Sequence, residues 1–98
     1  MSDNESIVTV LRDDFGFTIE NVHSTHVGDF VIVPLGERAR AVVVLGNRGD
    51  AEVQLHVDDE RASSAFVARN TDAIACELAR CRERSTNESA HVTDRERL

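Results

Sequence analysis

The stretch from residue 29 to 57 constrains the fold most, because it predicts three consecutive antiparallel strands. Residues 51–57 (Ala-Glu-Val-Gln-Leu-His-Val) alternate between apolar and polar side chains, which is typical of a strand with one buried face. Residues 38–45 begin as an alternation and end in the apolar run 41–45, which is typical of a strand covered on both faces. Glycine-containing turns separate the three expected strands, 29–34, 38–45 and 51–57.

The residues before this meander predict a helix and one more strand. Ile7, Val8 and Leu11 recur at helical spacing within residues 5–13, and Asn4 can act as the N-cap. A strand there is the alternative, because isoleucine, valine and threonine have low helix propensity. Residues 17–22 alternate and predict a first strand, followed by a polar link over residues 23–28. Pro34 cannot donate a ladder hydrogen bond, so it belongs at a strand end or on an edge.

Residues 58–84 fit two patterns. We favour a helical segment with a break near Asn70, in which Asp58 caps the first part. At 100° per residue its apolar side chains share one stripe, formed by Phe66, Val67, Ile74, Leu78 and Cys81. In the alternative, residues 63–69 form one more strand and only residues 71–83 are helical. Whether residues 59–69 are helix or strand stays open from the sequence.

These elements predict a single α+β domain. It combines a short N-terminal helix, an antiparallel sheet of about four strands and a C-terminal helical segment. We expect residues 1–4 to be a flexible N-terminus and residues 5–84 to form the domain. Residues 85–98 carry charges of both signs with no apolar periodicity, which predicts a disordered tail.

The charged residues have an unusual composition. All 11 basic residues are arginine, and 18 aspartates and glutamates give the chain a net charge of -7. This lysine-free, acidic composition resembles that of proteins from salt-in halophiles such as haloarchaea. At molar salt the Debye length is about 3 Å, so repulsion between the carboxylates is screened. We therefore favour the interpretation that the acidity is an adaptation to habitat, and a basic partner is the alternative that the sequence leaves open.

Localisation follows from what the sequence lacks. No signal peptide precedes the chain, and no apolar run approaches the roughly 20 residues needed to cross a bilayer. We expect a cytoplasmic protein with no membrane partner, whose two cysteines are reduced.

The histidines and cysteines are weak candidates for a metal or thiol site. His23 and His26 have an H-x2-H spacing, and Cys76 and Cys81 add soft donors, but zinc needs four ligands in a tetrahedron. Residues five apart on a helix point about 140° away from each other. No motif that would activate a cysteine surrounds either thiol. We predict no metal, no cofactor and no catalytic activity.

A nucleic-acid site is a second alternative. Arg38 and Arg40 share one strand face and could form a small basic patch. Binding of nucleic acid would need a longer positive stripe or aromatic side chains for stacking, and the four phenylalanines are expected in structural positions.

The covering of the sheet carries the main functional prediction. In the middle strand, Val42 and Val44 point away from Val43 and Leu45, so both faces require burial. One helix on each face would complete the monomer. If both helices cover the same face, the other face remains an apolar patch that binds a second polypeptide. We favour this second arrangement. The predicted interface residues are Val31, Val33, Val42 and Val44.

The sequence therefore predicts a non-catalytic protein-interaction or assembly module of a salt-adapted cytoplasm. It would be a homodimer or a subunit of a larger complex, binding itself or another protein. The alternatives are a small nucleic-acid-binding regulator and, third, a protein with a metal or thiol site.

Overall fold

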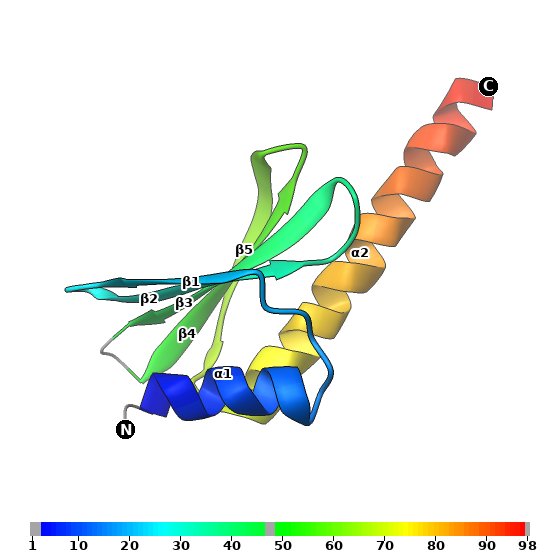
Figure 1. The fold of residues 1–98 in the computed structure, drawn as a ribbon. Helices are drawn as coiled ribbons and strands as arrows, with labels where there is room; N and C mark the ends of the chain where they lie inside the picture. The colour runs from blue at the N-terminus through cyan, green and yellow to red at the C-terminus, as the bar shows by residue number, and fades with distance from the viewer. Residues whose placement is uncertain (1–2, 47–48, 98) are drawn as a thin grey trace.

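The computed structural model describes the backbone of residues 3–46 and 49–97 and the side chains of residues 4–46 and 49–85 (Figure 1). The elements in chain order are α1 (Asp3–Asp13), β1 (Asn21–Thr25), β2 (Gly28–Pro34), β3 (Ala39–Gly46), β4 (Asp50–Val57), β5 (Glu60–Ala68) and α2 (Thr71–Arg97). The strands form one antiparallel sheet in the order β1-β2-β3-β4-β5. The predicted α+β class is confirmed: one helix precedes the strands in the chain and one follows them.

Strands β2, β3 and β4 confirm the predicted meander. Val31 in β2 lies opposite Val43 in β3, which in turn lies opposite Val53 in β4. Pro34 is the last residue of β2, as expected. The pairing of β1 with β2 ends at Ile32, so no β1 residue stands opposite the missing N–H of Pro34.

The strand predicted over residues 17–22 is wrong, because β1 occupies residues 21–25 instead. Residues 17–20 connect α1 to the sheet, and Phe17 is buried in the core while its N–H donates to the carbonyl of Leu11. All five β1 residues are exposed. An edge strand of this kind has no apolar face, so no alternation marks it in the sequence.

The helix favoured for the first part of residues 58–84 is also wrong. Residues 60–68 form β5, which pairs with β4. Asp58 does not cap a helix: Asp58 and Asp59 both have positive φ, 54° and 67°, and form the two-residue turn of the β4–β5 hairpin. Phe66, which fitted the apolar helical stripe, is 73% exposed on β5.

The predicted break near Asn70 is the start of α2. The side chain of Asn70 accepts a hydrogen bond of 2.8 Å from the backbone N–H of Ala73, as an N-cap does. The α2 backbone continues to Arg97, and the side chains after Ser85 lie outside the described residues. The tail predicted for residues 85–98 therefore stays a prediction, as do the domain limits at residues 4 and 84.

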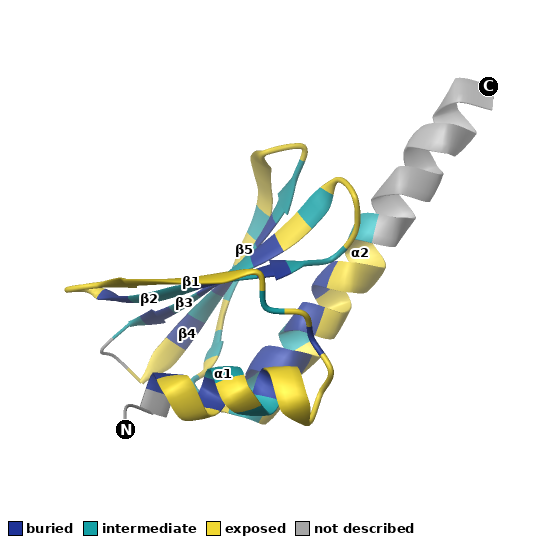
Figure 2. Cartoon of the chain, viewed as in Figure 1, coloured by how far each residue is buried: buried dark blue, intermediate teal, exposed yellow. Residues whose placement is uncertain are grey.

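Both helices cover the same face of the sheet, as the favoured arrangement requires. α1 contributes Ile7 and Leu11 to the core, and α2 contributes Ile74, Leu78 and Cys81. Figure 2 shows these buried segments meeting beneath the strands. The sheet side of this core consists of small and branched side chains, namely Val31, Val33, Ala41, Val43, Leu45, Ala51, Val53 and Leu55. Within the described residues, no helix has the length and apolar character needed to span a membrane.

Candidate interaction surface

The face of the sheet that points away from α1 and α2 is here named the open face. Cross-strand register places Phe30 opposite Val44, and Ile32 opposite Val42. All four side chains are only half-buried. Phe66 lies on the same face of β5, opposite Glu52. We name these five residues the apolar patch: Phe30, Ile32, Val42, Val44 and Phe66.

Polar side chains border the apolar patch along the strands. On one side lie Asp50 and Glu52 of β4. They line a hollow of about 480 Å³ that extends from His26 to Phe66. On the other side Arg40 in β3 stands opposite His56 in β4. The patch therefore has an apolar centre and a polar rim, which is the usual anatomy of a protein–protein interface.

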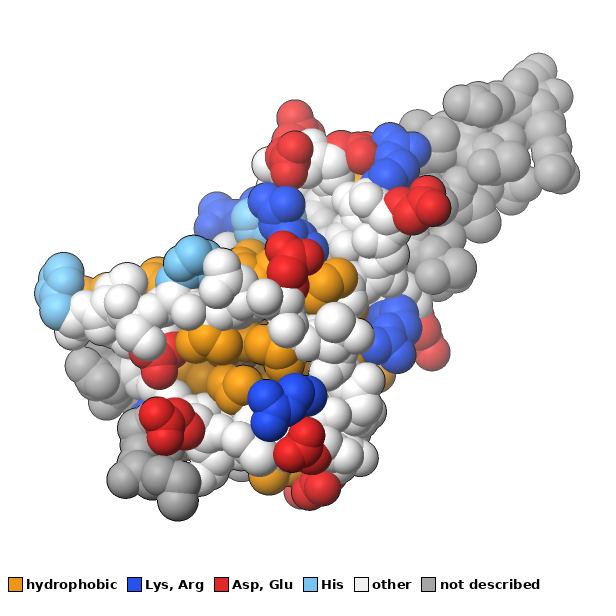
Figure 3. Space-filling model, viewed as in Figure 1, with side chains coloured by type: hydrophobic (Ala, Val, Ile, Leu, Met, Phe, Trp, Pro, Cys, Tyr) orange, Lys and Arg blue, Asp and Glu red, His pale blue; other side chains and the backbone are white. Residues whose placement is uncertain are grey.

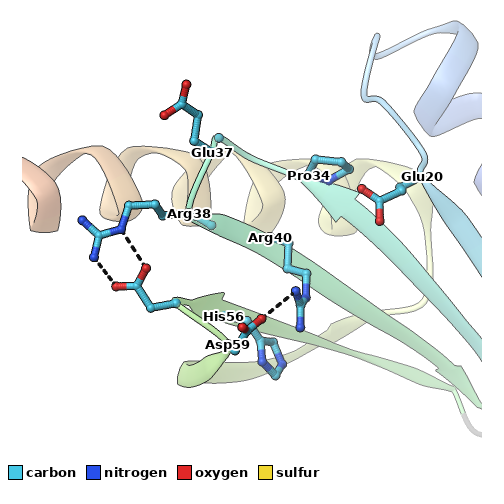
Figure 4. A pocket seen from close by; sticks show the side chains of 10 residues that line it. Glu20, Pro34, Glu37, Arg38, Arg40, His56 and Asp59 are labelled. Carbon is cyan, nitrogen blue, oxygen red and sulfur yellow. Dashed lines mark hydrogen bonds and ion pairs between the residues drawn. The ribbon is translucent and has the colours of Figure 1, made fainter.

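The rim on the arginine side is a cluster of ion pairs (Figure 4). Arg38 donates two hydrogen bonds to the carboxylate of Asp58, at 2.7 and 2.5 Å. Arg40 donates to Asp59 at 3.1 Å. These pairs hold the two residues of the β4–β5 turn, which have left-handed backbone conformations that cost energy for non-glycine residues.

The electrostatics of this cluster follow from its ion pairs and its partial burial. The hydrogen bonds from Arg38 lower the pKa of Asp58, and Asp58 in turn raises the pKa of Arg38. Burial lowers the pKa of His56, and the positive charges of Arg40 and Arg61 lower it further. His56 is therefore stabilised as a neutral imidazole, and its Nε2 lies 3.0 Å from the side-chain oxygen of Gln54.

The four predicted interface residues divide between the two faces. Val42 and Val44 lie on the open face, in the centre of the apolar patch. Val31 and Val33 are fully buried beneath the helices, so they belong to the core and not to a docking surface. The reason is the two-residue period of a strand: Val31 lies opposite Val43, and both point toward the helices.

The predicted basic residues are both held in ion pairs with aspartates. Arg38 precedes β3 and Arg40 lies within it, and their partners are the adjacent turn residues Asp58 and Asp59. The guanidinium groups that would contact phosphates are thus already paired with carboxylates of this chain.

The weak metal candidates do not form a cluster. His23 lies on β1, His26 lies in the β1–β2 turn, and both cysteines lie on α2. Residues 4–46 and 49–85 contain no group of three or more histidine, cysteine, aspartate or glutamate side chains that could hold a metal ion. Cys76 is exposed and Cys81 is buried. Burial and the nearby Glu77 raise the pKa of Cys81, which opposes formation of a nucleophilic thiolate.

A second hollow lies on the covered side, between α1 and β1. It has a volume of about 620 Å³, and Val8 and Val22 contribute its apolar lining while Asn4 and Asp29 contribute polar groups. Figure 3 shows hydrophobic side chains in the hollow between β1 and α1.

Sequence reasoning missed two features of these surfaces. It assigned Phe66 to the core because that residue fitted the helical stripe, whereas in β5 its side chain lies on the open face and is exposed. It also gave Asn4 only the role of a helix cap, whereas its side chain bonds to β2 and to the residue after β5.

No protein-family model, curated protein or solved structure matches this chain.

Proposed function

We propose that the chain is a non-catalytic assembly module of a salt-adapted cytoplasm, and that its open face packs against the open face of a second copy. The observation that carries this proposal is the position of the helices. Both cover one face of the sheet, which leaves Phe30, Val42 and Val44 half-buried on the other. A sheet with apolar side chains on both faces is stable in water when both faces are covered.

The charges at the rim favour a second copy over a strongly charged partner. The open face carries Arg61 and the ion pair of Arg40 with Asp59 toward one end of its strands, and Asp50 and Glu52 toward the other. A twofold axis that lies between the two copies and crosses the strands places the arginine end of one copy over the acidic end of the other. A partner with one dominant sign of charge would match only one end.

The size of the open face sets the expected affinity. Five strands spaced by about 4.8 Å and about 20 Å of strand length give about 500 Å² per copy. The resulting total of about 1,000 Å² is at the lower limit for a specific interface. We therefore expect a dimer with a dissociation constant in the micromolar range.

The alternative of nucleic-acid binding has less support. Its candidate residues, Arg38 and Arg40, are engaged by Asp58 and Asp59, and the net charge of -7 opposes association with phosphates except in concentrated salt.

Sedimentation equilibrium in dilute and in multimolar KCl tests the proposal. The wild-type chain should form dimers through this face, and Val44→Arg should abolish them because it places a charge in the centre of the apolar patch. Thr18→Arg is the matched control, since it adds the same charge at an exposed site in the connection after α1.

A second variant separates dissociation from unfolding. The double substitution Val42→Thr, Val44→Thr keeps the shape and the β-branching of both side chains, so it should weaken the dimer while the circular dichroism spectrum stays unchanged. A folded Val44→Arg variant that remains dimeric through this face, or a wild-type chain that stays monomeric at millimolar concentration, would overturn the proposal.

A further inference from the structure

The free edge of β5 is the longest unpaired strand edge among the described residues. β5 has nine residues and is the last strand of the sheet, paired with β4 alone. The opposite edge, β1, has only five residues. The free side of an edge strand presents N–H and C=O groups that can pair with another strand.

The register of β5 with β4 shifts at Ala62, which has no partner between Arg61 and Ser63. Beyond this bulge, β5 lacks the features that usually prevent such pairing. Its last seven residues, 62–68 (Ala-Ser-Ser-Ala-Phe-Val-Ala), contain no charge, no proline and no glycine. Edge strands in soluble proteins are commonly protected by charged side chains, proline or bulges. Here the charged residues lie at the two ends of the segment, with Glu60 and Arg61 before it and Arg69 after it.

The direction of the hydrogen-bonding groups can be assigned along β5. The N–H of Arg69 donates to the carbonyl of Gly49, on the β4 side. Because successive residues of a strand point their backbone groups to opposite sides, those of Ser64, Phe66 and Ala68 face the free edge. The side chains of these three residues are exposed. The carbonyl of Ala68 also accepts a hydrogen bond of 2.8 Å from the N–H of Asn70.

We propose that β5 pairs with β5 of a second copy, antiparallel, about a twofold axis that passes through Phe66. In this register Phe66 lies opposite its own counterpart, and Ser64 lies opposite Ala68 of the other copy. The two aromatic rings, each 73% exposed in the single chain, form a cross-strand pair.

The straight part of β5 selects this register. With the axis at Phe66 the paired segment runs from Ser64 to Ala68, the last residue of β5, so the bulge at Ala62 and the charged residues Arg61 and Arg69 remain outside it. An axis through Ala65 would pair Ala68 with Ala62, where the register of β5 shifts.

The occupant of this edge is a second copy because the uncharged segment 64–68 is centred on Phe66, so an antiparallel copy of β5 covers this exposed ring with its own counterpart. The edge pairing uses an axis perpendicular to the sheet, whereas the open-face dimer uses an axis parallel to it. The inference therefore does not rest on the proposed function. A chain that has both interfaces assembles into species larger than a dimer.

Disulfide trapping tests the register. In a Cys76→Ser background, which removes the exposed thiol, we expect Phe66→Cys alone to form a disulfide-linked dimer under mild oxidation. Directly paired residues have Cα atoms about 5.5 Å apart, within the range of a disulfide. Ser64→Cys and Ala68→Cys should cross-link only when the two variants are mixed. Cross-linking of Ser64→Cys by itself, or no cross-linking in any sample, would overturn the proposed pairing.

A proline variant tests the edge without disturbing the β4 ladder. Ser64→Pro removes an N–H that faces the free edge, so the single chain should fold normally while the edge pairing is lost. Ser64→Thr is the matched control and should keep the pairing. Sedimentation equilibrium of both variants, with circular dichroism to confirm folding, measures the outcome.

The effects of Val44→Arg and Ser64→Pro on association distinguish the two proposed interfaces. Association that survives Val44→Arg and disappears when Ser64→Pro is added supports the β5 pairing. A dimer that Val44→Arg alone abolishes, and that Ser64→Pro leaves intact, overturns the β5 pairing and leaves the open-face proposal standing. A dimer that Ser64→Pro alone abolishes, and that Val44→Arg leaves intact, supports the β5 pairing and overturns the open-face proposal.

Discussion

The side-chain amide of Asn4, near the start of α1, donates a hydrogen bond of 2.9 Å to the carboxylate of Asp29 in β2. The same amide group lies 3.4 Å from the carbonyl oxygen of Leu45 in β3, and Arg69 donates to the side-chain oxygen of Asn4. One side chain, only 9% exposed, thus connects the first helix to two strands and to the segment between β5 and α2.

We expect Asn4→Ala to lower the free energy of unfolding by about 1–3 kcal/mol, because it leaves Asp29 and Arg69 without their shared partner in a partly buried place. Ser6→Ala, at an exposed position of the same helix, is the control and should change stability by less than about 0.5 kcal/mol. Chemical denaturation measures both. Equal stabilities of the two variants would contradict this role of Asn4.

The turn between β4 and β5 stores backbone strain at Asp59, whose φ is 67°. Glycine adopts this conformation freely, whereas a side chain costs about 1 kcal/mol. Asp59→Gly and Asp59→Ala both lose the ion pair with Arg40, so their difference reports the backbone alone. We expect the glycine variant to melt about 4–8 °C above the alanine variant, as measured by thermal unfolding. The reverse order would show that the turn changes its conformation.

The lowered pKa of His56 makes stability depend on pH. The unfolded chain protonates this histidine near its ordinary value of 6.5, and the folded chain does so at lower pH. Between the two values the unfolded chain binds more protons, so the free energy of unfolding decreases as the pH falls below about 6.5.

We expect His56→Gln to remove this step from a stability profile measured by denaturation across the range, and His23→Gln, at an exposed site on β1, to retain it. Asp58 affects stability in a more acidic pH range. Because its pKa is lower in the folded chain, it stabilises the fold above about pH 3.8, and this contribution is lost as the pH falls through the pKa of the folded state.

The two thiols should differ in reactivity. Cys76 is exposed, whereas Cys81 is buried with a raised pKa. We expect iodoacetamide to alkylate Cys76 in the folded protein at least about tenfold faster than Cys81, because the thiolate is the reactive form and burial excludes the reagent. Mass spectrometry of timed samples measures the two rates, and unfolding in denaturant should make them similar. Rapid labelling of Cys81 in the folded protein would show that α2 separates from the sheet.

The meander could be predicted because alternation is a property of each strand by itself. Residues 51–57 show their buried face through Val53 and Leu55 regardless of what covers it. The position of Val42 on the face opposite Val43 follows in the same way. The assignment of Val31 to the docking surface failed because alternation gives two faces and does not say which one the helices cover.

The first and last strands, β1 and β5, could not be predicted from alternation in the sequence. β1 is exposed on both faces, so only its pairing with β2 defines it. β5 follows a turn of two aspartates, and the sequence therefore lacks the asparagine-glycine or aspartate-glycine signal of a tight hairpin. Phe66 and Val67 then fit a helix and a strand equally well. The contact between Arg69 and Asn4 joins residues 65 positions apart, a separation that no local pattern reveals.

The order of the strands has a kinetic consequence. Every strand pairs with its neighbour in the chain, so each hairpin closes a short loop and can form within microseconds. The packing of α1 against α2 joins the two ends of the chain and is the least local step. We therefore expect Leu11→Ala in α1 to speed unfolding while leaving the refolding rate nearly unchanged, and Val43→Ala in the central hairpins to slow refolding.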